Sequence, residues 1–578
     1  MTDKRSSRGQ RRDDDWAEML DGIEATGPSL LAEGHPAGRM VQELEPLLAS
    51  DLRLRPWAAL VAAAALHDAI RGDARVNTLI TQAEEQFGAR GDDRGTGYAA
   101  FVRGSVALGF GRLDEAVSSW RRSRELLTDK APMDEALVAM VGLAAYQDGN
   151  LRAAVALAEE AVALSRLRRN PRQESSALVY LAFFTLSLGQ CARADALLRV
   201  AGEVVGRLLS PEDRADAPML RAAIAVVAAL RGETAAAERH FAEAVSEAKS
   251  LGLGWQEAII RSLRAEFLID RNPELSLSDA REALAALHDL GEQWWIVWAE
   301  RALALAAVAL GDGTAGVIGL RRLLDRAMAP QERARTLVGL GKAFLQSGEV
   351  EAARTVLKEA DELHQALGAE YWRAEGLWLL ARADPAFATV HINQARAMSD
   401  GDVAYDELVS RSTRLSIQLL GQPRVSVDNT YCRFATHNAE KALYLLVLAP
   451  SRSLHAEVLA ERLWEECPPD KQAVRVRNLL WQMRQGLGSL HAWRVEYRRK
   501  VIRLDLTGAD VDVLTWERAA EGALGSGCSG EPAIELASVA SIAEALRKPL
   551  LPEWQYEDWV IDHQYRLRQI HDHLSVCE

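Results

Sequence analysis

A repeat of about 39 residues runs through the first two thirds of this 578-residue chain. Each unit has an Ala/Leu-rich segment, a short polar turn and a second segment that begins near alanine. The turn glycines are Gly34, Gly72, Gly111, Gly149, Gly189, Gly232, Gly311 and Gly348, and Arg271-Asn272 and Asp384-Pro385 fill two further turns. Glycine readily ends a helix in the left-handed conformation. A fixed period of this length predicts a solenoid of paired helices.

The repeats resemble tetratricopeptide repeats over about residues 30–400. Their longer period is similar to the superhelical array of the maltose-regulator type of bacterial activators. That resemblance implies a concave surface that senses an effector or binds a protein partner. The alternative is that the array is a passive scaffold.

The pattern changes after residue 402, where β-branched residues begin to alternate with polar ones. The alternation predicts strands over 415–421, 423–428 and 430–436. Helices are predicted over 438–449, with Asn438 as the cap, and over 456–464 and 471–487, followed by a β-hairpin over 493–506. This order is typical of a winged helix-turn-helix. The predicted fold is therefore mainly α, with a TPR-like α-solenoid, a small α+β winged domain and a short C-terminal helical segment.

Charge is distributed unevenly along the chain. The net charge is −14, yet residues 411–518 hold 17 Lys+Arg and 12 Asp+Glu, a balance of +5 that leaves −19 for the rest. Residues 470–503 alone hold nine basic and two acidic residues, a local +7. An acidic body with one basic module favours a confined nucleic-acid interface over a chain that coats nucleic acid along its whole length.

The predicted helix 471–487 has two distinct sides. Its buried side is expected to consist of Val474, Leu479, Leu480, Met483 and Leu487. The candidate DNA-binding residues are Lys471, Arg475, Arg477, Asn478, Gln482 and Arg484 on the other side, with Arg498, Arg499 and Lys500 at the hairpin turn. Arginine pairs with guanine edges and Asn or Gln with adenine, while cations on both elements suit phosphate contacts. The alternatives are an ordinary solvated basic face or a protein-docking module.

Residues 411–570 resemble the DNA-binding domain of two-component response regulators, and more narrowly the antibiotic-regulatory family with a bacterial transcriptional activator domain. The matching segments are LLGQPRVSVD (419–428), KALYLLVLAP (441–450), LAERLW (459–464), NLLWQMRQGLG (478–488), VIRLD (501–505), VDVLTWERA (511–519) and PLLPEWQYEDWVIDHQYRLRQI (549–570). The resemblance implies that helix 471–487 is the recognition helix and that the hairpin contacts the minor groove or the backbone. It also implies direct-repeat promoter DNA and RNA polymerase as partners.

Four regions follow from these patterns. Residues 1–15 are expected to form a disordered tail, 16–405 the repeat array, 411–510 the winged helix-turn-helix, and 511–578 a short segment similar to an activation domain.

Tryptophans are concentrated in the second half of the array. A candidate effector site is lined by Trp255, Trp294, Trp295, Trp298 and Trp372. Ligand pockets are largely apolar with a few polar groups, which favours this interpretation. The alternative is that these rings only pack the core between repeats.

Several function classes lack their sequence signals. The five cysteines are scattered, and no phosphate-binding GxxxxGK[ST], metal-ligand spacing, nucleophile–base pair or long apolar span occurs. We therefore expect a cytoplasmic, non-enzymatic protein without cofactor, metal or membrane contact. The favoured function is a DNA-binding transcriptional regulator, usually an activator in this family. The alternative is an adaptor in which the solenoid and the winged helix both dock proteins.

Overall fold

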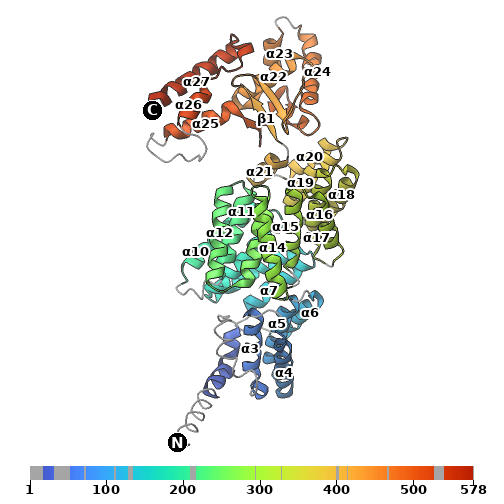
Figure 1. Ribbon diagram of the computed structural model, residues 1–578, viewed down its shortest axis with the longest axis vertical. Coiled ribbons are helices and arrows are strands. Elements are labelled where there is room, and N and C mark those ends of the chain that lie inside the picture. The colour runs from blue at the N-terminus through green and yellow to red at the C-terminus, as the bar shows by residue number, and fades with distance from the viewer. Residues whose placement is uncertain are drawn as a thin grey trace, which may run out of the picture. The chain divides into compact units, whose positions relative to one another are not determined.

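The computed structural model describes residues 17–31, 52–69, 73–109, 112–127, 134–208, 216–292, 295–326, 328–398, 403–412, 414–464, 468–525 and 539–576. The chain forms two compact units, residues 1–376 and 377–578, and each is considered by itself (Figure 1). The predicted tail, residues 1–15, lies outside the described residues. No helix within the described ranges is long and apolar enough to cross a membrane.

The first unit is a stack of antiparallel helix pairs. Its helices are residues 17–31, η2 (Leu52–Leu54), α3 (Pro56–Ala69), α4 (Arg75–Arg90), α5 (Asp93–Gly109), α6 (Leu113–Leu126), α7 (Asp134–Gln147), α8 (Leu151–Leu167), α9 (Pro171–Ser187), α10 (Cys191–Gly206), α11 (Ala217–Leu230), α12 (Thr234–Ser250), α13 (Gly254–Phe267), α14 (Pro273–Asp289), α15 (Ile296–Ala309), α16 (Gly313–Leu324), α17 (Pro330–Gln346), α18 (Val350–Leu367) and the start of α19 (Glu370–Ala383). Small residues such as Ala154, Ala158 and Ala194 are fully buried, which lets neighbouring helices approach closely. The predicted TPR-like solenoid is confirmed.

The turns between paired helices follow the predicted pattern. The five turn glycines that the structure describes have φ angles from 75° to 91°, and they are Gly149, Gly189, Gly232, Gly311 and Gly348. Asn272 replaces glycine in one turn and caps α14, because its side chain accepts a hydrogen bond from the backbone N–H of Leu275. The glycines predicted at 34, 72 and 111 lie outside the described residues.

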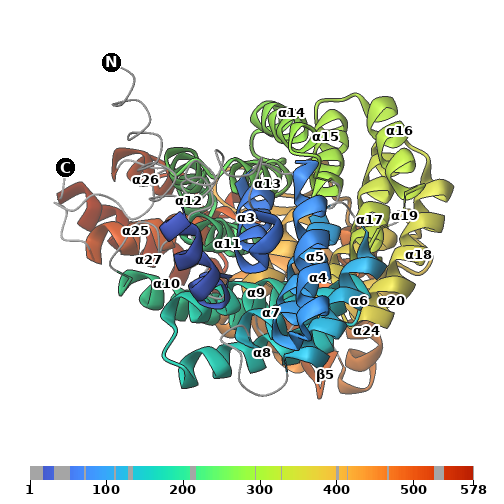
Figure 2. The same cartoon turned by 90° about the horizontal axis from the view of Figure 1, so that it is seen from below.

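The part of the array from α7 to α19 forms a closed ring, because α7 and α9 contact α17 and α19, about 186 residues further along. Trp372 Nε1 donates to the Leu186 carbonyl at 3.0 Å, and the Glu370 backbone N–H donates to the Leu188 carbonyl at 3.2 Å. Gln331 Nε2 donates to the Tyr146 carbonyl at 3.0 Å. In Figure 2, α11, α13, α15 and α17 follow one another around this ring, with α12, α14, α16 and α18 outside them.

The second unit contains the end of α19, the two short helices α20 (Ala388–Ala397) and α21 (Val403–Ser412), and an α+β domain. The domain's elements are β1 (Leu415–Gln418), β2 (Arg424–Val427), β3 (Thr430–Tyr431), α22 (His437–Leu448), η4 (Pro450–Arg452), β4 (Ser453–His455), α23 (Ala456–Leu463), α24 (Pro469–Leu487), η5 (Ala492–Arg494), β5 (Val495–Arg498), β6 (Val501–Leu504) and β7 (Asp510–Val511). One sheet has the order β3-β2-β1-β7 and the other β4-β6-β5. The predicted element types and order are therefore present.

Two details differ from the sequence-based expectation. Thr436, not Asn438, caps α22, because its hydroxyl accepts the backbone N–H of Ala439 at 3.3 Å. Val474 is 56% exposed, whereas Val476 is buried with Leu479, Leu480 and Met483. Position 476 is three residues before Leu479 and seven before Met483, so it lies on their face, while Val474 does not.

The C-terminal helices share a hydrophobic core with the α+β domain. They are α25 (Asp512–Gly525), α26 (Val539–Leu546), η6 (Pro552–Trp554) and α27 (Asp558–Val576). Leu551 N–H donates to the Leu419 carbonyl at 2.9 Å, and Trp554 stacks on His437 with ring centroids 4.9 Å apart. The segment is thus packed directly on β1 and α22.

Candidate nucleic-acid interface and ligand pocket

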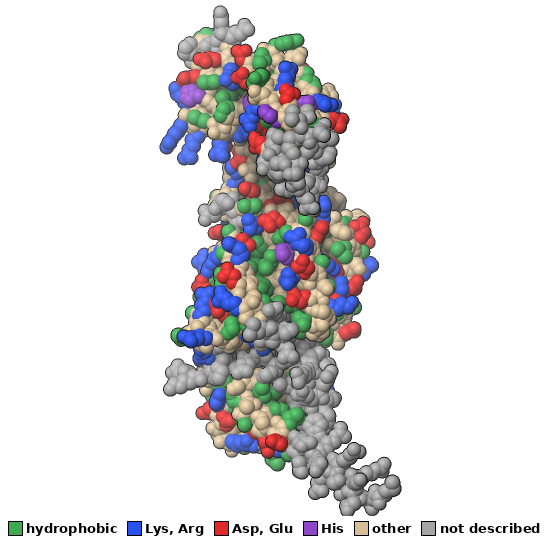
Figure 3. All heavy atoms as spheres, turned by 90° about the vertical axis from the view of Figure 1, so that its left-hand side faces the viewer, with side chains coloured by type: hydrophobic (Ala, Val, Ile, Leu, Met, Phe, Trp, Pro, Cys, Tyr) green, Lys and Arg blue, Asp and Glu red, His purple; other side chains and the backbone are tan. Residues whose placement is uncertain are grey.

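A group of exposed cations lies on α24 and the β5–β6 hairpin of the second unit. The predicted DNA-binding residues that are exposed are Lys471, Arg475, Arg477 and Asn478 on α24 and Arg498, Arg499 and Lys500 on the hairpin. Arg503 of β6 is also exposed; its charge was apparent from the sequence but its outward direction depends on the strand register. Figure 3 shows Lys and Arg side chains that project together from one edge of this unit.

Two of the predicted residues are tied into the fold. Arg484 Nη2 and Nε donate to the Val495 carbonyl at 2.7 and 3.1 Å, which joins the end of α24 to the start of the hairpin. The Thr436 hydroxyl donates to Gln482 Oε1 at 2.7 Å, so this amide is engaged at the start of α22. Both side chains are half-buried and hold α24 against its neighbours.

A further basic residue, Arg494, is fully buried at the base of the hairpin. Its guanidinium donates to the carbonyls of Asp505 and Thr507 at 3.0 and 2.7 Å and to His491 Nδ1 at 2.9 Å. Burial is the main reason that the pKa of Arg494 is lowered to about 10. Arg494 therefore positions the hairpin and adds nothing to its exposed charge.

The tip of the hairpin has an unusual backbone. Arg498 pairs with Val501 across the β5–β6 ladder, so Arg499 and Lys500 form a two-residue turn, with φ of 51° and 64°. Lys500 Nζ lies 3.1 Å from Glu457 Oε1 on α23, and this hydrogen bond lowers the pKa of Glu457. Turns of this kind strongly favour Asn-Gly or Asp-Gly, because positive φ is costly for long side chains.

Exposed apolar side chains accompany the cations. Trp481 on α24 is 60% exposed and Tyr497 on β5 is 46% exposed. The Arg475 guanidinium lies 5.7 Å from the centre of the Trp464 ring. Trp481 is not among the residues predicted from the sequence, because a tryptophan in an amphipathic helix is normally assigned to the core.

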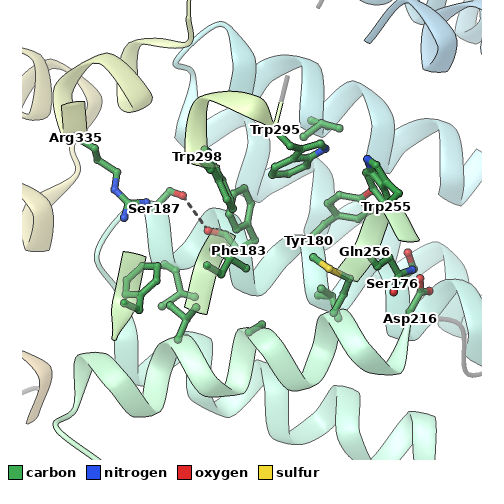
Figure 4. A pocket seen from close by; sticks show the side chains of 18 of the residues that line it. Ser176, Tyr180, Phe183, Ser187, Asp216, Trp255, Gln256, Trp295, Trp298 and Arg335 are labelled. Atoms are coloured by element: carbon green, nitrogen blue, oxygen red, sulfur yellow. Dashed lines mark hydrogen bonds between the residues drawn. The ribbon is translucent and has the colours of Figure 1, made fainter. Parts of the chain in front are cut away.

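A second candidate site lies inside the ring of the first unit. It is a cavity of about 130 Å³ between α9, α11, α13, α15, α17 and α19. Four of the five predicted tryptophans line it, namely Trp255, Trp295, Trp298 and Trp372, while Trp294 lies outside the described residues. Tyr180 and Phe183 of α9, both labelled in Figure 4, and Phe267 of α13 also line it.

The tryptophan rings of this pocket meet at steep angles, while the planes of Phe183 and Trp298 are tilted by 36°. Trp295 and Trp298 have centroids 4.7 Å apart and planes at 88°, and Trp255 and Trp295 are 6.2 Å apart at 75°. Phe183 lies 5.5 Å from Trp298. Trp298 is only 2% exposed, and its Nε1 has no hydrogen-bond partner among the described residues. The rings therefore form walls around a space and are not stacked in parallel.

The pocket has a polar group at each end, as Figure 4 shows. Asp216, Ser176 and Gln256 lie together at one end, and Ser187 and Arg335 lie at the other. Sequence reasoning missed these residues, because they come from three helices and an interhelical turn spread over 160 positions (176 to 335) and have no common motif. Only the fold brings them together.

A buried charge network lies behind the Arg335 end. Arg301 Nη2 is 2.9 Å from Glu266 and its Nη1 is 2.6 Å from Glu332, while Arg335 Nη2 is 2.6 Å from Glu266. Burial alone would raise the pKa of Glu266, but Arg301 and Arg335 hold it below its usual value. Tyr146 donates to Glu332 at 3.3 Å, and burial raises the pKa of this phenol. The network thus connects α13, α15 and α17 to α7 across the ring closure.

The described residues contain no group of three or more His, Cys, Asp or Glu side chains that could hold a metal ion.

No protein-family model and no curated protein matches the chain. Similar solved structures include the Cut9–Hcn1 hetero-tetramer of APC/C, 12% identical over 71% of this chain and 74% of that chain, with a TM-score of 0.43. A STAND protein with a tetratricopeptide repeat sensor from Pyrococcus horikoshii is 13% identical over 62% and 54%, with a TM-score of 0.35. A Rap protein complexed with competence and sporulation factor is 13% identical over 69% and 99%, with a TM-score of 0.33. At these values, the TPR-like fold assigned to this chain rests on its own helix pairs.

Proposed function

We propose that this protein is a DNA-binding transcriptional regulator in which the TPR-like ring senses a ligand. The observation that carries the proposal is the row of exposed cations on α24 and the hairpin, in a unit whose elements follow the order of a winged helix-turn-helix. In such a domain the third helix enters the major groove and the hairpin contacts phosphates or the minor groove. The resemblance of residues 411–570 to antibiotic-regulatory activators adds RNA polymerase as a partner and no catalytic role.

Individual residues of α24 fit different parts of DNA recognition. Arg475 and Arg477 are exposed cations that suit guanine edges or phosphates, and Asn478 is an exposed amide that suits adenine. Arg484 and Gln482 act here as positioning residues, since their polar atoms already bond within the domain.

The hairpin turn also supports the proposal. Strained residues persist where surrounding structure enforces them, and they concentrate at functional sites. Retaining Arg499 and Lys500 at positive φ, where Asn-Gly would be relaxed, is readily explained if their charges contact phosphate.

Helix α19 gives the two units a covalent connection. Trp372 lines the pocket of the first unit, while Trp378 of the same helix lies 6.0 Å from Trp493 in the second unit. Arg396 of α20 lies 4.0 Å above Trp493 and 2.7 Å from Asp505, at the base of the hairpin. A ligand that shifts the position of α19 would have a route to the hairpin, provided that it binds two arrangements with different affinity.

A second candidate function is a protein-interaction adaptor. The exposed Trp481, Tyr497 and Val474 favour it, because aromatic residues are enriched at protein interfaces. An adaptor would bind DNA weakly and without sequence preference.

The test is selection of genomic DNA fragments by the purified full-length protein at low and moderate salt. Recovery of a shared motif, with affinity that falls steeply as salt rises, supports the regulator.

Arg475→Glu with Arg477→Glu should abolish DNA binding while leaving the melting temperature unchanged. The matched control is Arg518→Glu with Arg568→Glu, which makes the same charge change at two exposed arginines of α25 and α27 and should preserve sequence-specific binding. Retained affinity in the first variant would contradict the α24 interface, and no selected motif would favour the adaptor.

A further inference from the structure

We infer that the aromatic pocket of the ring binds a small organic cation with an apolar body, such as an aryl-substituted amine or quaternary ammonium compound. This inference names the class of ligand that the ring would sense. It rests on the proposed function only for the claim that ligand binding regulates transcription. The binding itself is a property of the first unit, to which all the described lining residues of the pocket belong.

The aromatic walls provide the first part of the argument. Trp295 stands nearly perpendicular to both Trp298 and Trp255, at 88° and 75°. Tyr180 and Phe183 form a further wall from α9 (Figure 4). The face of an aromatic ring is electron-rich and attracts a cation most strongly when water is excluded. Several ring faces around one space can therefore hold a bulky, weakly hydrated cation.

The second part is the unequal charge at the two ends of the pocket. Arg335 is already neutralised, since its Nη2 lies 2.6 Å from Glu266 and its guanidinium lies 4.4 Å from the centre of the Trp372 ring. Asp216 lies at the opposite end beside Ser176 and Gln256. Burial raises the pKa of Asp216, and nearby Arg172 and a hydrogen bond with Ser176 oppose that rise only in part. Burial thus favours the neutral form of Asp216, and a ligand cation would offset this by stabilising the charged carboxylate, whereas a ligand anion would gain no such interaction.

The third part is size. One water molecule occupies roughly 10–15 Å³ of cavity volume. A cavity of about 130 Å³ therefore has room for on the order of ten water molecules. That space suits a compound with one or two rings and not a folded partner. Trp298 Nε1, for which the described part of the chain offers no hydrogen-bond partner, can donate to an acceptor atom on such a ligand.

Isothermal titration calorimetry on the full-length protein tests the inference with three probes of similar shape. Phenyltrimethylammonium is the cation, tert-butylbenzene is its neutral isostere, and benzenesulfonate is an anion. The cation should bind at least about tenfold more tightly than the neutral probe, which corresponds to about 1.4 kcal/mol, and the anion should not bind. Equal or tighter binding of the neutral probe, or no saturable binding of the cation, would overturn the inference.

Two substitutions in the pocket and one control substitution outside it locate the binding. Asp216→Asn keeps the side-chain shape and should lower affinity for the cation about tenfold or more, without changing affinity for the neutral probe. Asp289→Asn removes an exposed carboxylate from α14 and should change neither value. Trp295→Leu should weaken both probes. Circular dichroism would verify that each variant folds.

Undiminished cation binding by Asp216→Asn would contradict the assignment of the acidic end. These titrations contain no DNA and the fragment selection contains no ligand. Failure of the pocket inference would therefore leave the DNA-binding proposal intact, and the reverse also holds.

Discussion

The ring interior and the surface of α24 place charge in opposite ways. Inside the ring, Arg301 and Arg335 face Glu266 and Glu332, so that two guanidinium groups balance two carboxylates. On α24 and the hairpin, most of the cations are exposed, and within the described ranges Lys500, with Glu457, is the one among the exposed cations for which the structure gives an ion pair. The ring thus uses charge to join helices that are distant in sequence, whereas the α+β domain keeps its charge available.

This difference predicts how each set should respond to substitution. A buried, paired charge leaves its partner uncompensated when it is removed, which is costly to stability. An exposed, unpaired cation contributes little to folding and can be removed without that penalty. Removal of a buried charge inside the ring should therefore lower the free energy of unfolding. Removal of an exposed cation on α24 or the hairpin should lower DNA affinity without changing stability.

Arg301→Met is the change with the largest expected effect. The substitution leaves Glu332 buried without its cationic partner and removes one of the two cationic partners of Glu266. We therefore expect the free energy of unfolding, measured by urea titration, to fall by about 3–5 kcal/mol. The control is Arg333→Met on α17, whose exposed ion pair with Glu359 spans 2.8 Å and should be worth less than about 1 kcal/mol. Equal losses of unfolding free energy in the two variants would show that the buried ion pairs of the ring stabilise the fold no more than an exposed ion pair does.

Gly189→Ala tests the closure of the ring and has the next largest effect. A Cβ at Gly189 would lie 2.4 Å from the backbone nitrogen of Tyr371, on the opposite side of the closure. Gly348 has a similar φ, 77° against 83°, but a Cβ there would meet no other atom within 4 Å, so Gly348→Ala is the matched control. Both variants should lose about 1–2 kcal/mol from left-handed strain.

Only Gly189→Ala should lose a further 1–3 kcal/mol or so from overpacking. Hydrogen exchange should then quicken at residues 186–189 and 370–372 in that variant alone, because the hydrogen bonds of Leu186 and Leu188 with α19 would open. Identical stability and identical exchange in the two variants would mean that the ring is not held shut at this point.

Much of the fold could be predicted because local patterns encode it. The period of the turn glycines predicted the paired helices, and the change from helical spacing to alternation marked the start of the sheets at Leu415. The error at Val474 was one of helical phase, because spacing of three and seven residues from Leu479 and Met483 points to Val476. The face of an amphipathic helix is set by tertiary packing, which buries Val476 against Leu479 and Met483.

The residues of the two candidate sites also fall into those that the sequence could predict and those that it could not. The cations of α24 are neighbours in the sequence and could be found from charge alone, but the engagement of Arg484 with the Val495 carbonyl could not. The tryptophans of the pocket stood out by composition. Asp216, its acidic group, did not, because it meets Trp255 and Trp295 only after the array has curved. Ring closure between Tyr146 and Glu332 has no local signal at all.

The smallest and most discriminating change is Arg499→Asn with Lys500→Gly, because it should shift stability and binding in opposite directions. Asp428 and Asn429 form the comparable two-residue turn between β2 and β3, with φ of 48° and 65°, and use residues that tolerate such angles. Giving the hairpin a relaxed turn should raise the free energy of unfolding by about 0.5–1 kcal/mol. DNA affinity should fall on all sequences, with a salt dependence shallower by about one unit for each phosphate that the hairpin no longer binds.

Asn429→Gly, the control in the other turn, should leave DNA affinity unchanged. A loss of stability in the hairpin variant would mean that its cations hold the fold together, as those of the ring do, and the contrast between the two regions would fail.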